Sequence, residues 1–139
     1  MFKIFGLVLV ALAIAVAVVP HFTDCQSRGS LVALANGNQI PMKCHWTGVA
    51  EIGAAIPMAA VGIMTVASRR KETLTYLSIT GIALAGVILA LPNGLIGTCA
   101  LATHVCNTLM KPSLTAMGGV SALVGIVSLG FAWRGKGLT

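Results

Sequence analysis

The sequence predicts an all-α integral membrane protein, a four-helix transmembrane bundle whose extracytoplasmic loops carry cysteines. Hydrophobic residues make up 57% of the 139 residues, and charged residues only 9%. The apolar residues gather in four stretches, at about residues 4–20, 47–67, 73–91 and 113–133. A helix needs about 17–25 apolar residues to cross a bilayer. The rest of the chain is too short for a soluble domain, so we expect a single four-span domain.

The first stretch also has features of a secretory signal peptide. Lys3 precedes a short apolar run that ends in small residues, as in the charged and apolar regions of such peptides. Removing this segment would leave three spans and would upset the distribution of basic residues along the chain. We therefore expect a signal-anchor helix that is retained and ends near Pro20.

The basic residues predict the orientation of the spans. Six lie at one end of the four predicted helices and three at the other: Lys3, Arg69, Arg70, Lys71, Arg134 and Lys136, against Arg28, Lys43 and Lys111. Lysine and arginine are enriched in cytoplasmic loops. We thus predict a multi-pass plasma-membrane protein with both termini and residues 68–72 in the cytoplasm, and residues 21–46 and 92–112 outside. This bias explains the net charge of +6, and we expect no nucleic-acid partner.

The outer loops contain turn signals. Residues 31–34 and 39–40 flank Asn36-Gly37-Asn38, which predicts a small β-hairpin over the end of the bundle. The sequence Pro92-Asn93-Gly94 is typical of a turn that ends the third helix. Pro112 fits the first turn of the fourth helix, where its missing N–H costs nothing.

All four cysteines fall in the predicted outer loops. An even number of cysteines on an oxidising face predicts disulfides. Pairing within loops, Cys25–Cys44 and Cys99–Cys106, closes the shortest rings and is our first prediction. Pairing between the loops, which would link the two helical hairpins, is the alternative that the sequence leaves open.

Glu51 is the acidic residue within a predicted span, shortly after the interfacial aromatic Trp46. A carboxyl group inside a membrane usually faces the bundle interior or a wet cavity, and often has a function. It either carries a proton or a cation, or joins the helices through a hydrogen bond. The expected partners are outer-end side chains, with the segment 106–108 preferred: His45, Thr47, Asn107, Thr108 and Lys111.

Two kinds of chemistry compete with a purely structural role for the cysteines. Sulfur and imidazole ligands from Cys44, His45 and His104 suit copper, zinc or haem, but their spacing matches no established ligand motif. Two outward cysteine pairs are also typical of four-helix oxidoreductases that pass disulfides to quinone. Those enzymes use a CxxC pair, whereas Cys99 and Cys106 are separated by six residues. The sequence therefore favours a protein without a cofactor or catalytic residues.

Two motifs carry a resemblance to a known family. They are Cys44-His45-Trp46 followed by Glu51, and Cys106-Asn107-Thr108 followed by Lys111-Pro112. With the four-span layout, they resemble an uncharacterised family of small prokaryotic membrane proteins, catalogued as a domain of unknown function. The resemblance implies a frequent association with ABC-type transporters.

Small residues recur along the spans, for example Ala50 with Ala54 and Gly118 with Ala122. Small faces let helices approach closely in lipid, within one bundle or with a partner subunit. We therefore expect a non-enzymatic accessory or regulatory subunit of a larger membrane complex, such as an ABC-type transporter with its permease. The alternative is a thiol–disulfide redox or metal- or haem-handling membrane protein.

Overall fold

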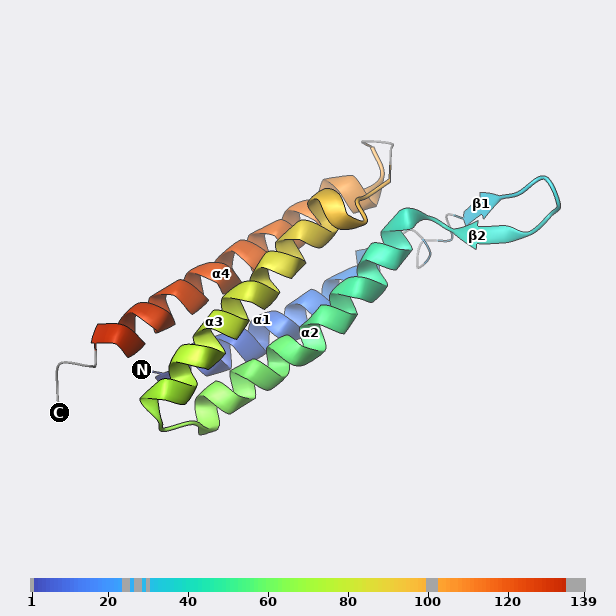
Figure 1. Cartoon of the computed structure of the whole chain (residues 1–139). Coiled ribbons are helices and arrows are strands. Elements are labelled where there is room, and N and C mark those ends of the chain that lie inside the picture. The colour runs from blue at the N-terminus through green and yellow to red at the C-terminus, as the bar shows by residue number, and fades with distance from the viewer. Residues whose placement is uncertain (1, 24–25, 27–28, 30, 100–102, 135–139) are drawn as a thin grey trace.

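The computed structural model describes residues 2–23, 26, 29, 31–99 and 103–134. Four long helices run along one another: α1 (Phe2–Thr23), α2 (Lys43–Ala67), α3 (Lys71–Ala90) and α4 (Lys111–Arg134). Figure 1 shows the four helices as one elongated bundle, with a two-stranded hairpin projecting from one end. We call this end the hairpin end, and the other end, where α1 begins and α4 stops, the terminal end.

All four helices are long and apolar enough to cross a membrane, which confirms the predicted four-span bundle. A helix satisfies its backbone groups internally, as a span in lipid requires. The large apolar side chains that lie on the outside, such as Ile14, Ile56 and Leu123, are suited to lipid. The chain is thus a multi-pass membrane protein, and its even number of spans brings both ends of the chain to the terminal end (Figure 1).

The core is a narrow stripe along each helix. On α1 the buried positions recur every three or four residues, from Gly6 through Leu9 and Ala13 to Thr23. They pack against a cluster that includes Met58 of α2 and Ile88 of α3. This spacing is the period of an amphipathic helix, although here the opposite face is apolar too.

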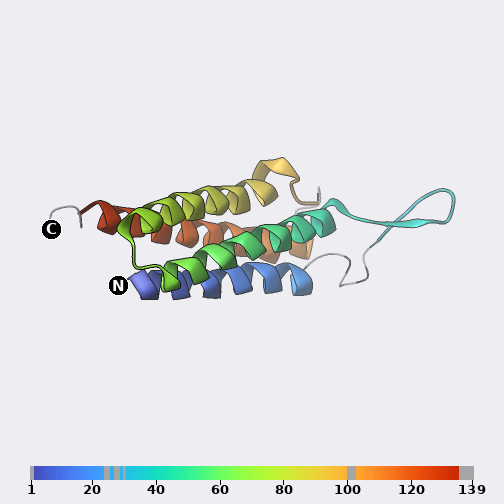
Figure 2. The same cartoon turned by 60° about the horizontal axis from the view of Figure 1, so that its bottom comes forward.

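The helices associate as two pairs, α1 with α2 and α3 with α4 (Figure 2). Gly6 and Gly62 form the close approach in the first pair, since a Cβ atom on Gly62 would lie 2.9 Å from the Gly6 carbonyl oxygen. In the second pair, a Cβ atom on Gly125 would lie 2.6 Å from Ile82. Ser78 and Ser128 add a buried hydrogen bond of 2.7 Å between α3 and α4. Of the small residues noted in the sequence, Gly118 also packs within the bundle, since a Cβ atom there would lie 2.9 Å from the Leu89 side chain.

The predicted hairpin is present, but it does not cover the bundle. Strands β1 (Leu31–Ala33) and β2 (Gln39–Pro41) pair antiparallel around a turn at Gly37, whose φ of 82° suits glycine. The residues of the hairpin are mostly exposed, and Figures 1 and 2 show it extending away from the helices. Its exposed residues include the apolar side chains of Val32, Leu34 and Ile40.

Helical structure at the hairpin end extends further than the sequence predicts. A π-helical turn, η1 (Leu91–Leu95), continues α3 past Pro92, and another, η2 (Cys106–Met110), precedes α4. Pro92 was expected to end the third helix at once. A π-helical turn is wider than an α-helical one, and this allows the chain to continue past a residue that lacks an N–H. Similarly, α1 continues through Pro20 to Thr23.

Candidate functional site

Three cysteine sulfurs meet inside the hairpin end. The Sγ atoms of Cys44, Cys99 and Cys106 all lie within 4.8 Å of one another. The Cys44 and Cys99 sulfurs are 3.1 Å apart. Cys44 and Cys106 are fully buried, and Cys99 is partly exposed. We call these three residues the sulfur cluster.

The helices position two of the three sulfurs. Cys44 lies in the first turn of α2, and Cys106 begins η2, which runs directly into α4. The prediction that both belong to loops is therefore wrong. Neither helix start needs a side-chain cap to hold it: residues Met42 and Val105, just before α2 and η2, make no capping hydrogen bond. The cysteine side chains of both helix starts are buried in the apolar core.

Hydrogen bonds hold Cys99 against the helices. The Asn107 side-chain amide donates to the Cys99 carbonyl at 2.7 Å, and its oxygen accepts from the hydroxyl of Thr98. The Thr47 hydroxyl donates to the Gly97 carbonyl at 2.6 Å, which ties α2 to the same segment. Gly97 has a φ of 82°, a left-handed conformation that glycine adopts readily. Together these bonds fix the segment that presents Cys99 to the other two cysteines.

Further sulfur and carbonyl atoms surround the cluster. The Met42 thioether sulfur lies 3.8 Å from the Cys99 sulfur. The Cys106 thiol lies 3.8 Å from the carbonyl oxygen of Thr23, at the end of α1. Met110, one turn after Cys106, is fully buried. The site is therefore rich in soft sulfur atoms and enclosed by α1, α2 and η2.

The predicted disulfides are not seen. No two of the described cysteines are at disulfide distance, since the 3.1 Å between Cys44 and Cys99 exceeds the bond length of about 2.05 Å. Cys25 lies outside the described residues, so the predicted Cys25–Cys44 pair is not described. The structure instead brings together Cys44 and Cys99, from different loops of the prediction.

The histidines do not join the sulfur cluster. Among the described residues, the group with metal-ligand spacing contains cysteines alone. The His45 ring packs edge-on to Trp46, with 5.8 Å between ring centroids, while Trp46 itself is exposed as an interfacial aromatic would be. His104 accepts backbone hydrogen bonds from Asn107 and Thr108 through its carbonyl. The set Cys44, His45 and His104 considered from sequence is thus not brought together as a ligand group.

Glu51 lies in the interior of α2, two turns beyond Cys44, and is 0% exposed. Neither carboxyl oxygen has a hydrogen-bond partner among the described residues. The expected contacts with residues 106–108 are absent, because Asn107 bonds to the Thr98–Cys99 segment and the Thr108 hydroxyl to His104. Thr47 forms the link between the helical hairpins that was expected of Glu51.

Lys111 stands where η2 passes into α4 and is part of the helix rather than of a loop. Its backbone N–H bonds to the carbonyl of Cys106, and its own carbonyl accepts from the Thr115 hydroxyl at 2.8 Å. With Asn107, Pro112 and Thr115, it lines an open pocket on the side of the hairpin end. The bonds that tie Lys111 into the helix are therefore made by its backbone.

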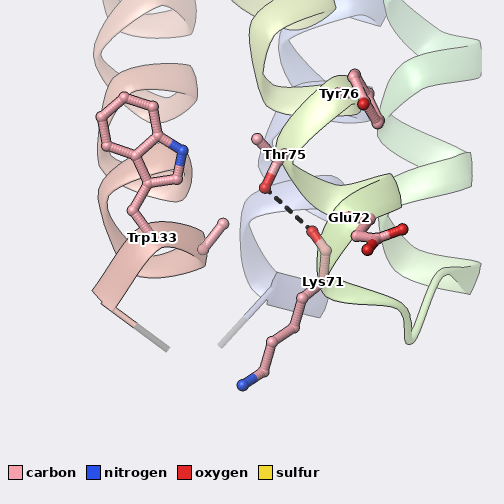
Figure 3. Close-up of a pocket in the computed structure, with 6 residues that line it drawn as sticks. Lys71, Glu72, Thr75, Tyr76 and Trp133 are labelled. Carbon is pink, nitrogen blue, oxygen red and sulfur yellow. Dashed lines mark hydrogen bonds between the residues drawn. The ribbon is translucent and has the colours of Figure 1, made fainter. Parts of the chain in front are cut away.

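A separate open pocket lies at the terminal end, between the start of α3 and the last turn of α4. Figure 3 shows Thr75 donating to the Lys71 carbonyl, a bond of 3.1 Å, with Trp133 across the pocket on α4. Glu72 and Tyr76 complete the polar lining. Among the described residues, the pocket contains no group of three metal-ligating side chains, in contrast to the sulfur cluster.

The match to known protein families covers nearly the whole chain. Residues 4–131 fit the model of a family described as Domain of unknown function (DUF4418). The chain belongs to this family. Membership agrees with the resemblance seen in the sequence, and it carries no assigned activity. No curated protein and no solved structure matches the chain.

In this DUF4418 member, sequence reasoning selected the three cysteines and Asn107 but missed Gly97 and Thr98. Gly97 and Thr98 belong to no motif recognised in the sequence. Their role depends on a contact with Thr47, fifty positions away in the chain. Such a contact has no local sequence pattern.

Proposed function

We propose that this protein is a non-enzymatic accessory subunit of a larger membrane complex, such as an ABC-type transporter, and that it acts through its hairpin end. The main support for the proposal is that the polar and sulfur-containing side chains inside the bundle gather near one end. The sulfur cluster, the Asn107 network and Glu51 all belong to the hairpin-end half, whereas the described middle of the bundle is packed with apolar and small residues. A small bundle of this kind is suited to act on a neighbouring protein in the membrane.

We further propose the orientation given by the basic residues. The terminal end would lie in the cytoplasm, together with the turn between α2 and α3 at residues 68–70. The hairpin and the sulfur cluster would then lie at the extracytoplasmic face. The exposed hairpin supports this role, because it extends from the bundle and leaves Val32, Leu34 and Ile40 open to a partner (Figure 2).

Site-specific photo-crosslinking in living cells tests the subunit proposal. A photoreactive residue would replace Trp46 or Leu109, which are exposed near the hairpin end. Matched controls would replace Ile63 and Ile126, which are exposed further along the same two helices. We expect both hairpin-end positions to give an adduct with one multi-pass membrane protein, in higher yield than the controls. Adducts with lipid alone, or equal yields at all four positions, would contradict the proposal.

The sulfur cluster favours a second candidate, a thiol–disulfide redox or metal-handling protein. The 3.1 Å between the Cys44 and Cys99 sulfurs supports pairing between the loops in an oxidised state, rather than within them. Peptide mapping under non-reducing conditions tests this state directly. A Cys44–Cys99 peptide pair would support the redox candidate, and pairs within each loop would support purely structural disulfides.

A further inference from the structure

We propose that the reduced sulfur cluster is a binding site for a thiophilic metal ion, specifically Cu(I), with Cys44, Cys99 and Cys106 as thiolate ligands. Three potential ligand atoms lie within 4.8 Å of one another and come from separate parts of the chain: α2, the segment after η1, and η2. Such convergence needs tertiary folding and gives a preformed site for one ion.

The distances suit a single metal ion. Sulfur ligands at about 2.3 Å from one ion lie about 3.8–4.0 Å from one another in tetrahedral or trigonal geometry. The three sulfurs fall within 4.8 Å, and the short Cys44–Cys99 separation of 3.1 Å needs to open by less than about 1 Å. Side-chain rotation can supply a shift of this size without moving the helices.

Burial of Cys44 and Cys106 in the apolar core disfavours isolated thiolates, so the bound cation supplies most of the compensating charge and the helix starts supply part of it. Cys44 and Cys106 lie in the first turns of α2 and of the helical path that ends at Arg134. The positive end of a helix dipole stabilises negative charge within its first turn. Two such helix starts at one site offset part of the negative charge that three thiolates keep after binding a monovalent ion.

Met42 favours copper over zinc. Its thioether sulfur is 3.8 Å from the Cys99 sulfur, which matches the spacing expected between ligands of one ion. Zinc sites in proteins use cysteine, histidine and carboxylate ligands, usually four of them. The described group offers three cysteines and no histidine or carboxylate, whereas thiolates with a thioether are a ligand set that suits Cu(I).

The Asn107 network prepares the site before the ion arrives. Its bonds to Thr98 and to the Cys99 carbonyl hold the Cys99 backbone beside the helices, and the Thr47–Gly97 bond restrains the same segment. Asn107 is therefore a positioning residue. Outer-shell partners of this kind orient metal ligands and contribute to affinity.

The test is a Cu(I) titration of the full-length protein, reduced and purified in detergent without oxygen, in competition with a coloured Cu(I) chelator. We expect one Cu(I) per chain and thiolate-to-copper absorption in the near ultraviolet. Single changes of Cys44, Cys99 or Cys106 to Ser should lower the affinity by more than about 100-fold, since even outer-shell changes cost about 10–100-fold. The triple Ser variant keeps Cys25 and controls for binding to an isolated thiol.

Two further measurements make the result independent of whether the Ser variants fold. X-ray absorption of the copper-loaded wild type should show three or four sulfur atoms at about 2.3 Å. Met42→Leu should lower affinity for Cu(I) but not for Zn(II), while Met64→Leu, an exposed position further along α2, should change neither. Nitrogen or oxygen ligands in the absorption spectrum, or equal Cu(I) affinity in the wild type and the triple variant, would overturn the proposal.

Discussion

At the scale of single residues, Glu51 departs most from what its position requires. Its carboxyl group is fully buried in a membrane-spanning helix and has no hydrogen-bond partner among the described residues. A buried polar group without a partner lowers stability by about 1–3 kcal/mol. A residue kept at such a cost is a candidate for function. Of the two roles considered for Glu51, a proton or cation carrier and a hydrogen-bonded link between helices, the second lacks its hydrogen bond among the described residues.

Glu51→Leu is therefore expected to raise the free energy of unfolding by about 1–3 kcal/mol, because it replaces an unsatisfied group with an apolar one of similar size. Glu51→Gln should give no such gain, since the amide is equally unsatisfied. Unfolding in a mixed detergent series, followed by circular dichroism, measures both. A loss of stability in the Leu variant would mean that the carboxyl group has a partner after all.

Thr47 makes a hydrogen bond that links the two helical hairpins. Replacing it with Val keeps the shape but removes the donor to the Gly97 carbonyl, so we expect a loss of about 1 kcal/mol. The control is Thr80→Val, whose exposed hydroxyl bonds only within its own helix, to the Tyr76 carbonyl. The same detergent unfolding series measures both variants, and equal effects would show that the link to Gly97 is not important for stability.

At the scale of the elements, glycines decide how closely the helices pack. α1 and α2 cross where Gly6 faces Gly62, and a Cβ atom on Gly62 would lie 2.8 Å from the Val10 side chain. Gly53, on the same helix, has no atom within 4 Å of the place of its missing Cβ. In lipid, close packing of this kind is a main source of helix association.

Gly62→Ala should therefore destabilise the bundle by about 1–3 kcal/mol, the usual effect of overpacking a close contact. Gly53→Ala should be neutral, or stabilising by up to about 1 kcal/mol, because alanine favours the helix and meets no neighbour. Comparing the two variants in one unfolding assay separates packing from helix propensity. If Gly53→Ala were the more harmful, the exposed face of α2 would have to be packed against another chain.

At the scale of the whole molecule, the two ends of the bundle differ: one carries a cluster of basic residues, and the other carries the sulfur cluster and the hairpin. Arg69 and Arg70 of the turn between α2 and α3, and Lys71 at the start of α3, lie at the terminal end, whereas the sulfur cluster and the hairpin lie at the other end (Figure 1). The positive-inside rule then predicts which end faces the cytoplasm.

Cysteine labelling in intact cells checks this orientation. A membrane-impermeant maleimide should label Asn36→Cys, in the exposed turn of the hairpin, and should not label Ser68→Cys until the cells are made permeable. The unmodified protein controls for reaction at the native cysteines. Labelling at position 68 in intact cells would show that the orientation is inverted.

The sequence by itself determined that this is a four-span membrane protein, because span length and apolar content follow directly from the thickness of the bilayer. It also determined that the helices form a bundle and that a hairpin occupies the first loop, since both depend on local patterns. Only the tertiary structure decided which residues of the candidate site lie next to one another. Cys44 and Cys99 are separated by 55 positions, and Thr47 and Gly97 by 50, yet both pairs are in contact. These contacts depend on how four nearly parallel helices pack and where each one starts, and no local pattern records that packing.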